Sequence, residues 1–405
     1  MEIKEKYRFI ILLGKALHKY GIPSYSIQDY LSKLAENVGV KGTFMDSPTW
    51  INYVFYDQEG EQCYNYIESV APGTLNLGAY SRIVETAELV VANKMNYSEM
   101  CDRLDSIHRK TLRVNHWLLT LAYALAAATF NLMIGSNWIS VAVSALLGAL
   151  VYLLVFLSSR YSYLNSVLES IASFVVTVLA GVLSIIFPQL NIGLTIVAAI
   201  IIFVPGLAIT SALEEITNKS LVSGTAKLFD AIISLFKQFF GVILGLTCLS
   251  FLTHFNIYNH RPETPYWVIF LAIPLFSMSL IPILQVRKKD LIAGILTGLV
   301  GFFVPYFTAA AGVLFSTFMG TIAVVITATL ISKYKHSPKT IFITQGVIML
   351  VPGSKTLFGL SDVFLNTNIV NATNLGEQVA YILMGILGGL LFGGVFSHEQ
   401  KQIQP

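Results

Sequence analysis

The chain has 405 residues, of which 55% are hydrophobic and 12% are charged, and its mean hydropathy is +0.67. Soluble domains carry about a quarter charged residues, so this composition excludes an ordinary soluble protein and indicates an integral membrane protein. The net charge of +3 is too small to indicate a nucleic-acid partner, and three widely separated cysteines exclude a disulfide framework or a zinc site.

Residues 1–114 predict a small α/β domain. Apolar residues recur at helical spacing over 4–20 and again over 24–39, where Ser24 is the expected N-cap and Gly39 the stop. Segments 42–46, 49–56 and 63–68 are rich in β-formers and predict strands, and 82–94 and 98–110 predict helices. The charged start, MEIKEKYR, is not a leader peptide, so we expect a cytosolic domain.

From Trp117 onward, long apolar segments recur, each of a length suited to about 30 Å of hydrocarbon. We expect ten spans, at about 117–134, 138–157, 167–187, 191–209, 228–253, 266–285, 291–308, 312–332, 340–351 and 376–396. With the N-terminus inside, the loops expected inside hold most of the lysines and arginines, and those expected outside hold only Arg261 and Lys355. The pattern therefore predicts a multi-pass protein with both termini in the cytoplasm.

A Val-Pro-Gly sequence occurs twice, at Val204 and again 147 residues later at Val351. At the same offset Asp230 aligns with Glu377, and Gly241 with Gly388. The sequence therefore predicts a polytopic α-helical membrane protein, with ten transmembrane helices as two five-helix repeats. The expected domains are 1–114, 115–257 and 258–405. Because five is odd, the second repeat must be inverted, which is typical of secondary transporters with a site near the bilayer midplane.

Proline removes a backbone donor and glycine permits a sharp turn, so each Val-Pro-Gly is expected to break a span. A helix that restarts after such a break presents its N-terminal amides, which favour an anionic group such as a substrate carboxylate. The alternative is that Val-Pro-Gly simply ends a span at the membrane surface. The expected substrate-binding residues are Pro205, Gly206, Thr210, Ser211, Pro352, Gly353, Ser354, Lys355 and Thr356.

Ionisable residues near or within the spans are candidates for proton coupling, because a charge in hydrocarbon is costly unless it faces a cavity or a partner. Asp230 and Glu377 are the principal pair, and capping of a helix start is the alternative for both. Lys237 lies two turns after Asp230 on one face and is expected to pair with it, either structurally or to hold a substrate carboxylate. The remaining candidates are Glu215 and Asp362, which short amphipathic surface helices would also explain; Glu169 is expected at the membrane interface.

The sequence contains no P-loop, nucleophile elbow or metal-binding motif, so we expect no cofactor, no enzyme activity and an ion gradient as the driving force.

Three segments, LGKALHKYGIPSYSIQDYLSKLAENVGV, SPTW and APGTLNLGAYSRIVETAELVV, resemble the amino-terminal half of the threonine/serine exporter family, and the two Val-Pro-Gly repeats resemble its membrane halves. The resemblance covers about 7–396 and extends to fungal pheromone-regulated membrane proteins. It implies ten spans, a cytosolic amino-terminal domain, and export of threonine and serine driven by the proton motive force. In some bacteria the halves resemble separate subunits implicated in dicarboxylate export. The resemblance supplies no set of site residues.

The sequence interpretation is therefore a proton-antiport exporter of small polar amino acids in a lipid bilayer, working by alternating access. The amino-terminal domain would either gate the membrane part or mediate homo-oligomer formation. Two alternatives remain open: a dicarboxylate exporter on the same scaffold, and a membrane scaffold or sensor that transports nothing.

Overall fold

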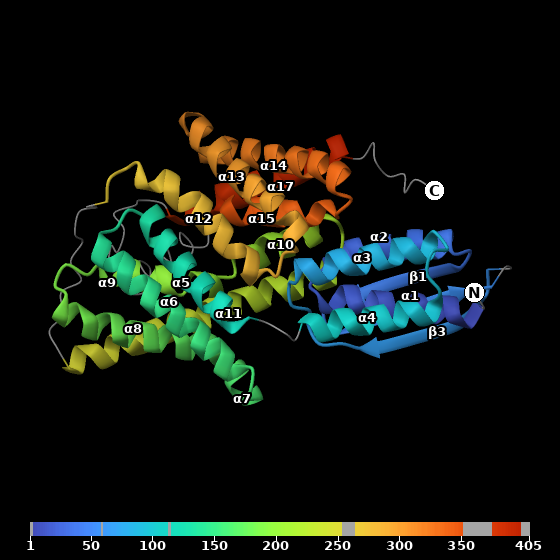
Figure 1. Cartoon of the computed structure of the whole chain (residues 1–405), viewed down its shortest axis with the longest axis horizontal. Helices are drawn as coiled ribbons and strands as arrows, with labels where there is room; N and C mark the ends of the chain where they lie inside the picture. The colour runs from blue at the N-terminus through green and yellow to red at the C-terminus, as the bar shows by residue number, and fades with distance from the viewer. Residues whose placement is uncertain (1–2, 58–59, 112–114, 253–263, 351–374, 398–405) are drawn as a thin grey trace.

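The computed structural model describes residues 3–57, 60–111, 115–252, 264–350 and 375–397. Figure 1 shows two parts: an N-terminal domain with a small sheet, and a larger set of apolar helices. The N-terminal elements are α1 (Ile3–Lys19), α2 (Ser24–Asn37), β1 (Lys41–Ser47), β2 (Trp50–Tyr56), β3 (Gln62–Ser69), α3 (Leu77–Val91) and α4 (Tyr97–Thr111).

The sheet is antiparallel in the order β1-β2-β3, with Tyr53 opposite Phe44 on one side and Tyr66 on the other. Alternate residues of β2 are buried, which is the period expected of a strand with one face on a core. Helix α1 packs closely on β2: a Cβ added to Gly14 would lie 2.5 Å from Oη of Tyr53. The α/β domain expected from the sequence is therefore present.

Two boundary predictions were wrong. Ser24 does not cap α2: it is the first residue of the helix, Pro23 is the N-cap, and the Ser24 hydroxyl bonds elsewhere. Helix α3 begins at Leu77, ahead of the expected residue 82, because the side chain of Asn76 accepts a hydrogen bond from the amide of Ala79 and caps the helix.

The apolar helices form two groups along the chain. The first helix group contains α5 (His116–Met133), α6 (Trp138–Ser158), α7 (Ser162–Asn165), α8 (Leu168–Ile186), α9 (Ile192–Ala199), η1 (Ile201–Phe203), α10 (Gly206–Thr217) and α11 (Leu221–Leu252). The second helix group contains α12 (Val268–Ile283), η2 (Lys288–Asp290), α13 (Leu291–Thr308), η3 (Ala309–Ala311), α14 (Val313–Lys335), α15 (Lys339–Leu350) and α17 (Leu375–Ser397).

Seven helices of the described residues are long and apolar enough to cross a membrane, and eight if the bent pair α9–α10 is one span. All ten expected apolar segments form helices, but two are shorter than a span: α12 has 16 residues and α15 has 12. The structure therefore supports a mostly helical membrane protein with seven to eight candidate spans.

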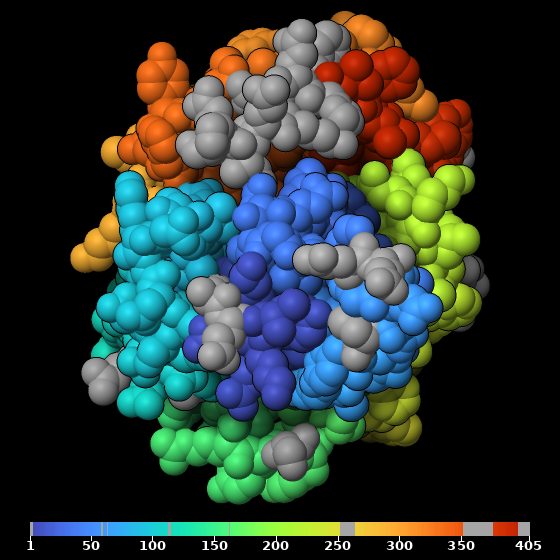
Figure 2. All heavy atoms as spheres, turned by 90° about the vertical axis from the view of Figure 1, so that its right-hand side faces the viewer, coloured from blue at the N-terminus to red at the C-terminus, as the bar shows by residue number. Residues whose placement is uncertain are grey.

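The N-terminal domain does not stand apart from the helices. A single hydrophobic cluster runs from Phe9 and Leu13 of α1 into α12 and α15, where it includes Leu280, Ile341 and Phe342. In Figure 2 the blue and cyan N-terminal domain faces the viewer, with orange and red residues of the second group above it and green residues of the first group below.

Candidate functional site

The helix break expected at the first Val-Pro-Gly is present. The segments Ile192–Ala199 and Ile201–Thr217 meet at 52°, and α10 restarts at Gly206 with Pro205 as its N-cap. Gly206 and Thr210 are buried, Ser211 is half-buried, and the Thr210 hydroxyl donates to the carbonyls of Gly206 and Leu207 within its own helix. The first four expected substrate-binding residues therefore lie together at the start of α10.

A backbone carbonyl freed by the break is satisfied by a side chain. Nε2 of Gln238 on α11 donates to the carbonyl of Phe203 at 2.8 Å and lies 3.3 Å from Oγ of Ser234. Gln238 is fully buried, and its Oε1 has no hydrogen-bond partner in the part of the chain that the structure describes. A buried backbone group at such a break needs a hydrogen-bond partner inside the protein. For the carbonyl of Phe203, the side-chain amide of Gln238 is that partner.

The same chain of hydrogen bonds reaches a carboxylate. Oγ of Ser234 donates to Oε1 of Glu169 on α8 at 2.8 Å, and Nζ of Lys237 lies 3.4 Å from the other carboxylate oxygen. An acid in one membrane helix is thus linked, through Ser234 and Gln238, to the break in another. We call Glu169, Ser234, Lys237 and Gln238 the break network.

The expected pairing of Lys237 with Asp230 was wrong, because Lys237 faces α8 and pairs with Glu169. Asp230 is exposed and lies well inside α11, which begins at Leu221, so capping of the helix start does not explain it. Glu377 does lie in the first turn of its helix, α17; it is exposed and accepts a hydrogen bond from Oη of Tyr381 at 2.7 Å.

Six expected site residues lie outside the described residues: Pro352, Gly353, Ser354, Lys355, Thr356 and Asp362.

The far end of α10 carries a second buried cluster. Glu215 is fully buried, and its Oε1 accepts hydrogen bonds from the amide of Ser24 at 2.9 Å and from Nζ of Lys227 at 2.5 Å. Its Oε2 is buried without a partner among the described atoms. A short amphipathic surface helix was the alternative explanation for Glu215; α10 is a helix of 12 residues, and the N-terminal domain covers this carboxylate.

Ser24 connects Glu215 to a histidine–aspartate pair. Oγ of Ser24 donates to Oδ2 of Asp46 at 2.6 Å and lies 2.7 Å from Oγ of Ser223 on α11. Nδ1 of His18 lies 2.7 Å from the other oxygen of Asp46. We call His18, Ser24, Asp46, Glu215, Ser223 and Lys227 the interdomain cluster.

The interdomain cluster holds a histidine, an aspartate and a serine, but they are not connected as in a hydrolase. Nε2 of His18 lies 3.1 Å from the carbonyl of Ala71, which can only accept, so this nitrogen carries a proton and cannot serve as a base. Ser24 bonds to Asp46, whereas a nucleophilic serine needs a histidine as its base. The arrangement fits a structural joint between domains.

A neighbouring tyrosine adds to this joint. Oη of Tyr25 donates to Oε1 of Glu214 at 2.6 Å. Burial raises the pKa of the Tyr25 phenol well above its usual range, and the negative charge of Glu214 raises it further. Tyr25 therefore stays protonated and remains a donor to α10.

The second helix group is held by α3. The amide of Leu77 donates to the carbonyl of Leu284 at 3.1 Å, and Nδ2 of Asn76 donates to Oε1 of Gln285 at 2.7 Å. A Cβ added to Gly78 would lie 2.2 Å from the carbonyl oxygen of Gln285, so the backbones approach more closely than another residue would permit.

An ion pair completes this contact. An Arg287 guanidinium nitrogen lies 2.6 Å from Oε2 of Glu85, whose other oxygen contacts Arg103 at 3.1 Å. Burial alone would raise the pKa of Glu85, but the hydrogen bond and charge of Arg287, with Lys289 and Arg103, hold that pKa below its usual value. Glu85 is thus ionised and anchors α3 to the second helix group.

Sequence reasoning missed Gln238, Ser234 and most of the interdomain cluster. Gln238 could have been identified from the sequence, because a side-chain amide inside a long apolar helix is costly unless it has a hydrogen-bond partner. Ser24, Asp46 and His18 carried no comparable signal, since short polar residues in a globular domain are common.

These features define a class: a helical membrane protein with a broken helix, joined at that helix to an N-terminal domain. Residues 8–249 match a family model described as "Putative threonine/serine exporter", and residues 268–396 match one described as "Threonine/Serine exporter, ThrE". The chain belongs to the threonine/serine exporter family.

Several curated relatives come from fungi. A Schizosaccharomyces pombe protein without an assigned function is 26% identical over 76% of this chain and 42% of its own length. Pheromone-regulated membrane protein 10 is 26% identical in Saccharomyces cerevisiae, over 75% of this chain and 40% of the relative. The protein of the same name in Eremothecium gossypii is 25% identical, over 92% of this chain and 52% of the relative. The chain thus spans about half the length of these relatives or less, and no solved structure matches it.

Proposed function

We propose that this protein exports small polar amino acids, threonine and serine first, in exchange for protons. The observation that carries the proposal is the broken helix α9–α10 in a chain of the exporter family. The substrate carboxylate would bind at the N-terminus of α10, near Gly206, Thr210 and Ser211, because the amides of a restarted helix favour an anion. Pro205 makes the break.

The remaining expected residues keep their proposed roles. Residues 352–356 would form the matching half of the substrate site. Asp230, Glu377, Glu215, Asp362 and Lys237 would take part in proton coupling. Protons, the substrate and the bilayer are the proposed partners, both termini would be cytoplasmic, and self-association remains a proposed property of the N-terminal domain.

The proposal includes ten spans in two inverted repeats, and the packing scheme supports it. Helix α8 packs on α11 as α14 packs on α17, and α6 packs on α9 as α13 packs on α15. The α8–α11 and α14–α17 pairs both have a glycine at the contact: Gly241 of α11 lies against Ser173 of α8, and Gly389 of α17 lies against Thr321 of α14. Helices α5 and α12, which correspond at the 147-residue offset, pack on each other, as equivalent helices do across a two-fold axis.

Between the two substrate classes, the pairing of Lys237 favours the amino acid. A dicarboxylate needs an additional cation; Lys237 is already held 3.4 Å from Glu169, which leaves Lys355 of the expected site as the candidate, so dicarboxylate export would depend on Lys355. Threonine and serine are zwitterions, so their single carboxylate can be met by helix amides.

The test is counterflow in proteoliposomes under an imposed pH gradient, with labelled threonine, serine and succinate offered separately. The Asp230→Asn/Glu377→Gln variant is compared with the parent protein and with Asp29→Asn, whose carboxylate is exposed on the N-terminal domain. We expect threonine and serine exchange, pH-driven accumulation lost in the double variant, and parent behaviour in the control. Folded protein that moves none of the three compounds would remove the transport function; a double variant with intact pH-driven accumulation would remove these two carboxylates from it.

A further inference from the structure

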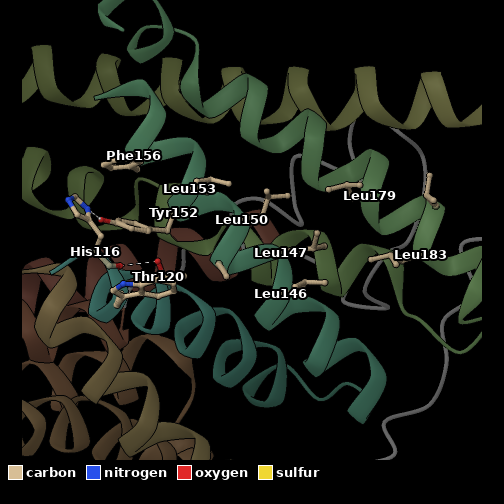
Figure 3. Close-up of a pocket in the computed structure, with 13 residues that line it drawn as sticks. His116, Thr120, Leu146, Leu147, Leu150, Tyr152, Leu153, Phe156, Leu179 and Leu183 are labelled. Atoms are coloured by element: carbon tan, nitrogen blue, oxygen red, sulfur yellow. Dashed lines mark hydrogen bonds between the residues drawn. The ribbon is translucent and has the colours of Figure 1, made fainter. Parts of the chain in front are cut away.

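An apolar groove lies between α5, α6 and α8, and its lining includes no residue of α9 or α10. Its volume is about 720 Å³, within the range of small-molecule sites, about 300–1,000 Å³. Figure 3 shows leucines of α6, Leu146, Leu150 and Leu153, facing Leu179 and Leu183 of α8 along its length. Leu146 and Leu153 are 64% and 49% exposed, so the groove is open on the outside of the helices.

The groove's position and length suit a lipid tail. All three helices are long and apolar enough to span a membrane, so the open side faces hydrocarbon. From Leu146 to Phe156 helix α6 rises about 15 Å, which is half of the roughly 30 Å hydrocarbon thickness. The groove therefore covers the depth of one leaflet.

One end of the groove carries polar and basic groups. Nδ1 of His116, at the start of α5, lies 2.8 Å from Oη of Tyr152 (Figure 3), and its ring packs edge-on against Phe156. The Arg160 guanidinium lies over the same Phe156, with its carbon 5.1 Å from the ring centroid. Trp117, which is 82% exposed, lies beside His116 and is a residue typical of the membrane–water interface.

We propose that this groove binds one acyl chain of an anionic phospholipid, with the headgroup phosphate between His116 and Arg160. Arginine is well suited to phosphate, and a basic residue at the membrane surface attracts anionic lipids. A second copy of the chain would also cover an apolar face, but it would have to place exposed Arg160 and His116 against its own interface. A phospholipid matches both parts of the groove, since its acyl chain is apolar and its phosphate is anionic. The proposal does not depend on which substrate is transported.

The test is native mass spectrometry of the full chain, purified in detergent, delipidated and titrated with phosphatidylglycerol or phosphatidylcholine of equal acyl length. Leu153→Trp fills the groove, and Leu330→Trp, at a 53% exposed leucine on α14, is its matched control. Arg160→Ala removes the headgroup contact without filling the groove. Circular dichroism and melting temperature establish that each variant is folded.

We expect one phosphatidylglycerol bound in preference to phosphatidylcholine. Arg160→Ala should weaken that binding about fivefold. Leu153→Trp should abolish it, and Leu330→Trp should leave it unchanged. Equal retention of both lipids, equal behaviour of the two tryptophan variants, or a lipid-free dimer that Leu153→Trp dissociates would each overturn the proposal.

Discussion

Replacement of Lys227 by methionine should loosen the N-terminal domain from α10. The Glu215 carboxylate is fully buried, and Lys227 is its partner cation at 2.5 Å. Removal of the lysine leaves a buried negative charge with the amide of Ser24 as the remaining donor to Oε1. The strain therefore falls on the first turn of α2, where the domain meets the membrane helices.

Breaking a buried ion pair from one side costs about 3–5 kcal/mol. Because the Lys227 side chain is 31% exposed, solvent screens part of that interaction, and we expect a loss of about 2 kcal/mol. This corresponds to an opening equilibrium about 30-fold more populated. Adding Glu215→Gln removes the charge but keeps an acceptor for Ser24, so the double variant should recover to within about 1 kcal/mol of the parent.

Hydrogen–deuterium exchange of peptides from α2 and α10 measures this opening directly. The control is Lys33→Met, which breaks the exposed Lys33–Asp29 pair within α2 and should change exchange by less than twofold. Unchanged exchange in Lys227→Met would refute the reasoning. Equally fast exchange in the single variant and in the Lys227→Met/Glu215→Gln double variant would also refute it, because the loss of stability would then not come from the unpaired charge of Glu215.

Three further predictions concern other contacts. Gly78→Ala drives a Cβ into the carbonyl of Gln285 and should expose α3 to exchange, whereas Gly376→Ala, whose added Cβ would have no described atom within 4 Å, should not; equal effects would contradict this. Partial desolvation of the carboxyl and the nearby Glu85 charge raise the pKa of Glu88, which lies on the exposed side of α3, so Glu88 makes a small, solvent-screened contribution to folding when protonated and loses it as pH rises through its folded pKa. Glu88→Gln should therefore raise the melting temperature at pH 7 and lose that advantage below about pH 4; an advantage that grows on acidification would reverse the sign. Gln238→Leu removes the donor to the carbonyl at the helix break and should cost about 1 kcal/mol, seen as a lower melting temperature in detergent; an unchanged value would mean that water or another donor replaces the amide.

The sequence predicted the features that repeat along one element. Ile10, Leu13 and Leu17 recur at helical spacing and are buried along one face of α1, because periodicity reports burial locally. The break at Pro205 was predicted for a similar reason: the proline acts on its own backbone.

Contacts between elements could not be predicted in the same way. Lys237 lies on one face of α11 with Asp230, but its partner depends on how α8 is rotated against α11, which spacing within α11 does not determine. Glu215 illustrates the same limit, since the N-terminal domain that buries it lies about 190 residues earlier in the chain (the pair spans 191 positions).

The N-terminal domain contacts both helix groups. It holds the first through the interdomain cluster and Tyr25, and the second through Gly78 and Glu85. If transport follows the proposed alternating access, rocking of one helix group against the other would have to detach the domain from one side, and the domain would then restrain that motion. Both contacts contain an ion pair, but the carboxylate of Glu215 is fully buried whereas that of Glu85 is 38% exposed, so ionic strength should weaken the Glu85 contact first.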